Sequence, residues 1–226
     1  DHLFRRLSGV VASETVLAHV RKATQGENTV LNCHPFQYGR FTFAHNGDIP
    51  GFDTKRDALV ALIEPRLRRY VLGETDSEVL FYLLLTQLAR RGPLVSDFAA
   101  DDLAAAMSET VSLVRDITDV GDEEAALLTF IVTNGATMLA TVGGRPLFYS
   151  THKNRCADRD TCASLSPECE APTVSGKVNH LVLSSEPLHG ENVWIPIEAG
   201  TIMGVDRGMA LFRGRIGVRA LPVVAA

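Results

Sequence analysis

Three short segments of the sequence concentrate the residue types that carry out chemistry in proteins. They read A-H-V-R-K-A-T-Q-G at 18–26, N-C-H-P-F at 32–36 followed by F-A-H-N-G-D-I at 43–49, and G-E-T-D-S-E-V-L at 73–80. Each also has an ordinary structural interpretation: an arginine ending a strand often forms a surface ion pair, Asn46-Gly47 predicts a hairpin turn, and T-D-S-E is a capping box. Taken singly, none of them predicts a function.

In this order and spacing, the three segments resemble the glutaminase domain of the class II glutamine amidotransferases, which are Ntn hydrolases. The resemblance runs from about residue 10 to residue 90 and continues more weakly through later strands and S-S-E-P-L at 184–188. It implies a four-layer αββα sandwich with two sheets between helical layers. It also implies hydrolysis of glutamine or another γ-glutamyl amide through a thioester on an N-terminal cysteine.

The resemblance assigns the residues that bind the amino-acid head of the substrate. Arg21 stands at the family's R-x-A-T arginine and would pair bidentately with the α-carboxylate, which its planar fork suits. Asp76 stands at the E-T-D aspartate and would hold the α-ammonium group. Thr24 and His34 fall in the same motifs, and we expect them to line the pocket.

The resemblance also assigns an oxyanion hole to Asn46 and Gly47, the family's H-N-G pair. The asparagine side chain and the glycine backbone N–H would donate to the oxygen of the tetrahedral intermediate, where one donor can be worth about 3 kcal/mol. Glycine also suits the positive φ that a turn at this place would need. The same dipeptide would form a hairpin turn without any catalytic role.

The nucleophile of the family is a cysteine at the mature N-terminus, and Asp1 has no thiol. The family places a longer stretch before A-H-V-R than the 17 residues that precede Ala18. We therefore expect the cysteine and two core strands to belong to a part of the protein outside this sequence, so the chain alone would bind but not hydrolyse.

Four cysteines are present, and none fits the nucleophile position. Cys33 precedes His34, but adjacent residues of an extended segment point to opposite faces, so we interpret Cys33 as a small buried filler. Three more lie in a polar stretch with His152 nearby: Cys156, Cys162 and Cys169. A zinc site, a disulfide and plain loop cysteines all remain open, although the spacing lacks a C-x2-C knuckle. We expect no metal and no cofactor.

The elements that must position these segments follow from the hydrophobic pattern. Strand patterns cover 15–20 and 40–45, and helical periodicity then covers 54–120, with Pro65 interrupting it. Residues 79–88 are apolar on all sides, which predicts a helix buried between layers. At its start, Thr75 is predicted as N-cap with Glu78 reaching back to it. A third helix carries one apolar face: Leu103, Met107, Val111, Val114 and Ile117.

From residue 125 the period becomes that of strands. An antiparallel meander is predicted from 128–133, 137–142 and 145–149, a long polar loop or insertion at 151–178, and further strands after it. The later strand patterns cover 181–185, 200–205 and 209–212. The order strands, helices, strands predicts an α+β fold, and residues 1–226 show no linker that would divide them into domains.

Composition limits the partners. The 226 residues are 46% hydrophobic and 22% charged, with a net charge of −5, which argues against a nucleic-acid or anionic-membrane surface. No apolar run approaches the roughly 20 residues of a membrane span. The few cysteines favour a reducing, cytoplasmic compartment.

The wording of the motifs is closer to stand-alone γ-glutamyl hydrolases, such as those of ergothioneine synthesis and glutathione degradation, than to the sugar-phosphate synthase. Glutamine or a γ-glutamyl small molecule is therefore the expected ligand. A homo-oligomer and an ammonia-accepting partner subunit are both compatible with the sequence. The alternatives are a non-catalytic glutamine-binding or regulatory subunit and a protease using Cys33.

Overall fold

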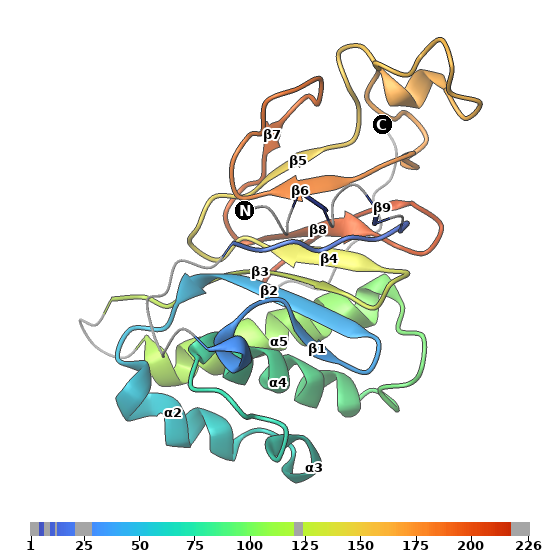
Figure 1. Ribbon diagram of the computed structural model, residues 1–226. Coiled ribbons are helices and arrows are strands. Elements are labelled where there is room, and N and C mark those ends of the chain that lie inside the picture. The colour runs from blue at the N-terminus through green and yellow to red at the C-terminus, as the bar shows by residue number, and fades with distance from the viewer. Residues whose placement is uncertain (1–4, 7–9, 12, 21–28, 120–123, 218–226) are drawn as a thin grey trace.

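The computed structural model describes residues 5–6, 10–11, 13–20, 29–119 and 124–217. Within these ranges, helices cover one face of a six-stranded sheet, and a three-stranded sheet lies on the other side of it (Figure 1). The helices are α2 (Phe52–Ala61), α3 (Pro65–Arg68), α4 (Asp76–Ala89) and α5 (Ala100–Thr118). Short 3-10 helices cover Val30–Asn32 and Pro167–Cys169.

The large sheet is antiparallel throughout, in the order β1-β2-β3-β4-β8-β9. Its strands are β1 (Phe36–Tyr38), β2 (Phe41–Asp48), β3 (Leu127–Thr133), β4 (Met138–Thr141), β8 (Thr201–Val205) and β9 (Leu211–Arg215). The small sheet has the order β6-β5-β7. Its strands are β5 (Phe148–Ser150), β6 (Val182–Ser184) and β7 (Ile195–Pro196).

Helix α4 lies at the centre of the core, as the apolar run at 79–88 predicted. Residues 76–88 of this helix are all buried, since α4 packs between the sheet and the neighbouring helices. Phe81 of α4 stacks on Phe43 of β2, with ring centroids 5.2 Å apart. The predicted apolar face of α5 also packs into this core. Burial of each such side chain stabilises the fold by about 1.5–3 kcal/mol.

The opposite face of the large sheet carries a second, smaller apolar cluster. Ala140 of β4 and Leu147 form part of it, and Ile131 of β3 and Leu183 of β6 pack against it. Successive strand residues point to opposite faces, so β3 and β4 contact the helices with one set of side chains and the small sheet with the other. The fold is thus the predicted α+β arrangement, and the described residues form the helix, sheet and sheet layers of the sandwich.

Three local predictions were wrong. Residues 15–20 form no strand, and β2 continues through Asn46-Gly47 to Asp48 instead of turning there. Asn46 pairs with Thr129 and Gly47 with Leu128, so β3, which is distant in sequence, supplies the partner that a local hairpin would have supplied. The third strand of the expected meander, β5, pairs with β6 and β7 in the small sheet.

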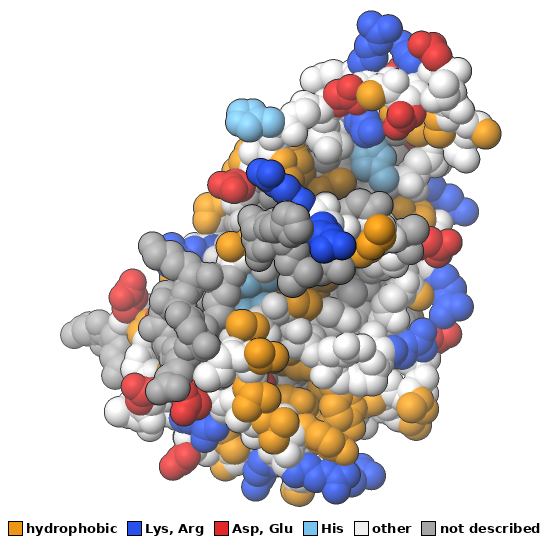
Figure 2. All heavy atoms as spheres, in the orientation of Figure 1, with side chains coloured by type: hydrophobic (Ala, Val, Ile, Leu, Met, Phe, Trp, Pro, Cys, Tyr) orange, Lys and Arg blue, Asp and Glu red, His pale blue; other side chains and the backbone are white. Residues whose placement is uncertain are grey.

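The surface carries charges of both signs, and hydrophobic side chains gather over the helical layer in Figure 2. Exposed large residues of that layer include Leu62, Tyr70 and Leu72. Among the described residues, no helix has both the length and the apolar character needed to cross a membrane.

Candidate active site

The end of β2 and the start of α4 are joined by the carboxylate of Asp76. Its Oδ2 accepts the backbone N–H of Ile49 at 2.9 Å, and its Oδ1 accepts the backbone N–H of Ser77 at 2.7 Å. The residue is only 4% exposed. As the first residue of α4, it lies where the helix dipole favours negative charge. The fold thus places a buried carboxylate directly beside the end of the H-N-G strand.

His45 connects three elements at this place. Its Nδ1 lies 2.9 Å from the Ser77 hydroxyl on α4, and its Nε2 lies 2.9 Å from the Leu127 carbonyl at the start of β3. Burial lowers the pKa of the imidazole, while the nearby Asp76 carboxylate and the Leu127 carbonyl act in the opposite direction. The ring is therefore neutral near pH 7. Because the Leu127 carbonyl can only accept, Nε2 carries the proton and Nδ1 accepts from Ser77.

Gly47 is a site of close backbone approach. A Cβ at this position would lie 1.8 Å from the Leu127 carbonyl oxygen and 2.4 Å from His45 Nε2. Gly47 is not among the glycines with positive φ, so the turn conformation predicted for it was wrong. Glycine is required here because the strand and the Leu127 carbonyl leave no space for a side chain.

In a regular antiparallel ladder, the register of Gly47 with Leu128 directs the backbone N–H of Gly47 away from β3. Leu128 donates its own N–H to the Gly143 carbonyl on the opposite side, so Gly47 and Leu128 form a pair without mutual hydrogen bonds. The neighbouring Asn46 is half-buried, and strand alternation places its side chain on the face opposite His45, toward the small sheet. Asn46 and Asp76 thus approach the end of β2 from different faces.

Segment 72–74 is fixed against this site by two buried polar side chains. Glu78 accepts the N–H groups of Leu72 at 3.0 Å and Gly73 at 2.7 Å, and Asn32 accepts the N–H of Glu74 at 2.9 Å. Burial raises the pKa of Glu78, although the two backbone N–H groups act against it. Thr75 caps the Glu78 N–H as predicted, at 3.3 Å. The predicted return contact from Glu78 to Thr75 was wrong, because its carboxylate binds the preceding loop.

His34 joins the first two sequence motifs. Its ring centroid lies 4.2 Å from that of His19 and 4.8 Å from that of Phe36. Arg21 and Thr24 lie outside the described residues. Cys33 is exposed and its thiol donates to the Thr29 carbonyl, so the prediction of a buried filler was wrong.

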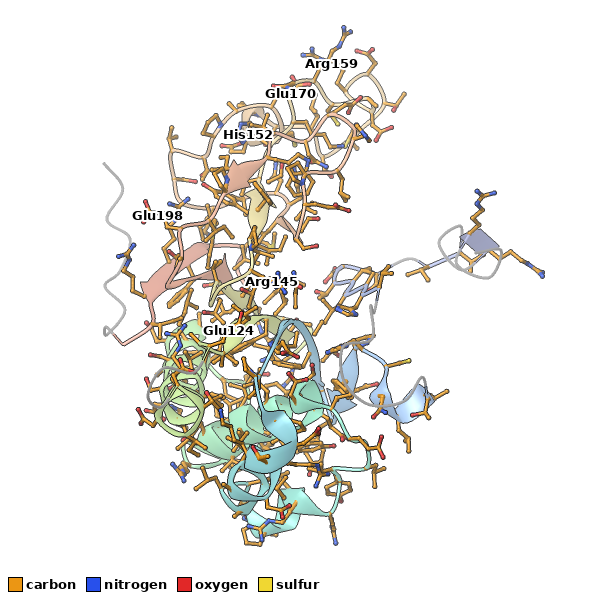
Figure 3. The ribbon with its side chains drawn as sticks, turned by 90° about the vertical axis from the view of Figure 1, so that its left-hand side faces the viewer. Glu124, Arg145, His152, Arg159, Glu170 and Glu198 are labelled. Atoms are coloured by element: carbon orange, nitrogen blue, oxygen red, sulfur yellow. The ribbon has the colours of Figure 1, made fainter. Side chains whose placement is uncertain are left out.

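The three cysteines of the 151–178 stretch are free thiols. No group of three or more potential ligand side chains in the described ranges is arranged to hold a metal ion. Glu170 organises this stretch instead: it accepts the Cys156 N–H at 2.7 Å and pairs with Arg159 at 3.3 Å (Figure 3). These contacts lie at the end of the small sheet, far from the helical layer in both ribbon views.

Sequence reasoning missed the residues that organise the site. His45 and Ser77 were within the quoted motifs but were given no role, and Asn32 was likewise passed over. The available signal was their position next to predicted site residues. Their partners, however, are 32 to 82 positions away in sequence, which no local pattern encodes.

Comparison with known proteins agrees with this architecture. The family model described as "Glutamine amidotransferases class-II" matches residues 2–218. The probable glutamine amidotransferase DUG3 of Saccharomyces cerevisiae is 30% identical over 217 residues, covering 86% of this chain and 58% of DUG3. The putative glutamine amidotransferase YafJ of Escherichia coli is 28% identical over 197 residues, covering 84% of this chain and 69% of YafJ. The chain thus spans little more than half of DUG3.

A solved structure shares the fold. The glutamine aminotransferase class-II domain protein from Silicibacter pomeroyi superposes with a TM-score of 0.57 at 24% sequence identity. The superposition covers 85% of this chain and 74% of that protein.

Proposed function

We propose that this chain, which belongs to the class II glutamine amidotransferases, binds the γ-glutamyl head of its substrate and stabilises the oxyanion formed at the substrate's amide. The observation that carries the proposal is the bond from Ile49 N–H to Asp76 Oδ2 at 2.9 Å. The bond holds the Asp76 carboxylate, our candidate for the α-ammonium group, at the end of the strand that carries Asn46 and Gly47, our candidate oxyanion donors.

The head of the substrate is an amino acid with two opposite charges. Asp76 offers the charge for the α-ammonium group, and burial strengthens that attraction because water does not screen it fully. Two backbone N–H groups keep the carboxylate oriented, so little ordering is left for binding. Arg21 pairs with the α-carboxylate, and Thr24 and His34 line the pocket, as the motif resemblance implies.

The reacting end of the substrate is its amide, which we assign to Asn46 and Gly47. In the proposed reaction, the thiolate of an N-terminal cysteine attacks the amide carbon and forms a tetrahedral oxyanion. The side-chain N–H of Asn46 and the backbone N–H of Gly47 donate to that oxygen. The α-amine of the cysteine, which took the proton of the thiol, passes it to the leaving nitrogen, so collapse of the intermediate expels ammonia and leaves a γ-glutamyl thioester. Water then hydrolyses the thioester, which releases glutamate and restores the thiol.

The substrate is glutamine or a γ-glutamyl small molecule of the kind used by stand-alone hydrolases. The relatives DUG3 and YafJ are both named as glutamine amidotransferases, which supports a γ-glutamyl amide as the reacting group. An ammonia-accepting partner subunit is the alternative destination of the released nitrogen.

The test uses the full-length protein with glutamine and with glutathione as substrates. The proposal expects release of glutamate and covalent labelling of the N-terminal cysteine by a reactive glutamine analogue. Absence of both glutamate release and labelling would contradict it. Saturable glutamine binding without hydrolysis or labelling would instead identify a non-catalytic binding subunit.

A further inference from the structure

The imidazole of His45 forms hydrogen bonds to α4 and to β3, beside the residues proposed to bind the two ends of the substrate. It is buried at 3% exposure and lies immediately before Asn46 on β2. One ring nitrogen contacts Ser77, the neighbour of Asp76 on α4, at 2.9 Å. The other contacts the Leu127 carbonyl of β3 at the same distance. Asp76, next to Ser77, and Asn46, next to His45, are residues proposed to bind the substrate.

The contact with Leu127 bears on the position of Gly47 in β2, one of the two proposed oxyanion donors. The Leu127 carbonyl oxygen lies where a side chain on Gly47 would be, 1.8 Å from its ideal Cβ. His45 Nε2 approaches the same Cβ position to 2.4 Å. Rotation or displacement of the imidazole therefore shifts the carbonyl that packs on Gly47, and with it the direction of the glycine N–H.

The contact with Ser77 sets the position of the helix. Ser77 has one hydroxyl hydrogen, and its oxygen is nearer to His45 Nδ1, at 2.9 Å, than to Asp76 Oδ1, at 3.2 Å. The Ser77 backbone N–H remains on Asp76 Oδ1 at 2.7 Å. Loss of the imidazole would remove the hydrogen bond between the first turn of α4 and β2 and leave that turn tied to the end of β2 by the Ile49–Asp76 bond, while Phe81 and Phe43 still pack further along the two elements.

We infer that His45 is a positioning residue: through Ser77 and Leu127 it holds the ammonium-binding carboxylate and the oxyanion donors at the separation that a γ-glutamyl group requires. The inference rests on the proposed function. A substrate held at both ends reacts only when its amide meets the oxyanion donors, and a displacement of about 1 Å can reduce the rate by about 100-fold. Binding of the head at Asp76 needs no such match. Loosening the link therefore lowers kcat more than it raises KM.

Three variants of the full-length protein separate the two contacts. His45→Ala removes both. His45→Gln can keep a donor toward Leu127, and His45→Asn can keep an acceptor toward Ser77. We expect His45→Ala to lower kcat for glutamine hydrolysis 10- to 100-fold with less than a 3-fold change in KM. Each amide variant should recover part of that loss.

The matched control is Thr110→Ala, a buried change on α5 whose hydroxyl bonds within its own helix. Active-site titration with the glutamine analogue corrects every rate for the fraction of competent protein. The control should then retain wild-type kcat even if its Tm falls as far as that of His45→Ala. Ser77→Ala should add little to the kcat loss of His45→Gln, because both remove the His45–Ser77 contact and Ser77→Ala removes in addition only the longer hydroxyl contact with Asp76 Oδ1.

The outcomes are distinct. If the wild-type protein hydrolyses glutamine and His45→Ala retains its kcat per titrated site, the positioning role is overturned and the proposed function stands. If His45→Ala and the control lose kcat equally at equal loss of Tm, the role is structural only and the inference is again overturned. A wild-type protein that neither hydrolyses nor binds glutamine overturns the proposed function and the inference together.

Discussion

Gly47→Ala tests the close approach between β2 and the Leu127 carbonyl. The added methyl group would lie 1.8 Å from that carbonyl oxygen and 2.4 Å from His45 Nε2, so the chain must move. Overpacking that shifts backbone costs about 1–3 kcal/mol. Breaking the buried His45–Leu127 hydrogen bond leaves both groups without their partner and costs about 1–3 kcal/mol more. We therefore expect Gly47→Ala to lower the free energy of unfolding by about 2–6 kcal/mol.

The assay is urea unfolding of the same chain followed by circular dichroism. Its control is Gly92→Ala, where a Cβ would meet only Phe98, at 3.9 Å. We expect the control to stay within about 0.5 kcal/mol of wild type, as surface changes do. If the free energy of unfolding of Gly47→Ala lay within about 1 kcal/mol of the wild-type value, the reasoning would be refuted. The strand would then accommodate a methyl group where the structure shows the Leu127 carbonyl oxygen.

Three further predictions concern buried polar groups. Thr141→Val should raise the free energy of unfolding by about 1 kcal/mol in the urea assay, because its fully buried hydroxyl has no hydrogen-bond partner among the described residues. Acidification should destabilise the chain below about pH 6.5, since the unfolded state then binds the proton that buried His45 resists. His45 contributes at most about 1.4 kcal/mol per pH unit to this slope, and His45→Gln should remove that contribution. Glu78→Gln should cost about 1–2 kcal/mol and speed amide exchange at Leu72 and Gly73, because a carboxamide has one acceptor oxygen where the carboxylate has two. Unchanged stability of Thr141→Val would contradict the first prediction, and a flat profile of stability against pH would contradict the second. Unchanged amide exchange at Leu72 and Gly73 in Glu78→Gln would contradict the third.

Local periodicity predicted the helical half of the fold. The apolar run at 79–88 and the stripe from Leu103 to Ile117 both form core helices. They could be predicted because the residues that form the apolar face of a helix lie close together in the sequence. The strand meander was predicted only in part. Which sheet β5 joins depends on β6 and β7, whose pairing residues lie more than 30 positions away.

The site shows the same division between local and distant information. The motifs proposed Asp76, Asn46 and Gly47 as site residues, which stays a prediction, but the structural reason for the glycine was misjudged. Asn-Gly is the usual hairpin signal, and only the arrival of β3 beside β2 turns it into a close strand contact. His45 escaped assignment for a related reason, since its contacts on α4 and β3 appear only in the folded chain.

Steady-state hydrolysis of glutamine by the full-length protein and its Asp76→Asn variant tests the central claim most directly. The variant keeps the size of the side chain and removes the charge proposed to hold the α-ammonium group. The account predicts glutamate release by the wild-type protein and a KM at least 10-fold higher in the variant. An unchanged KM, or a wild-type protein that releases no glutamate, would contradict it.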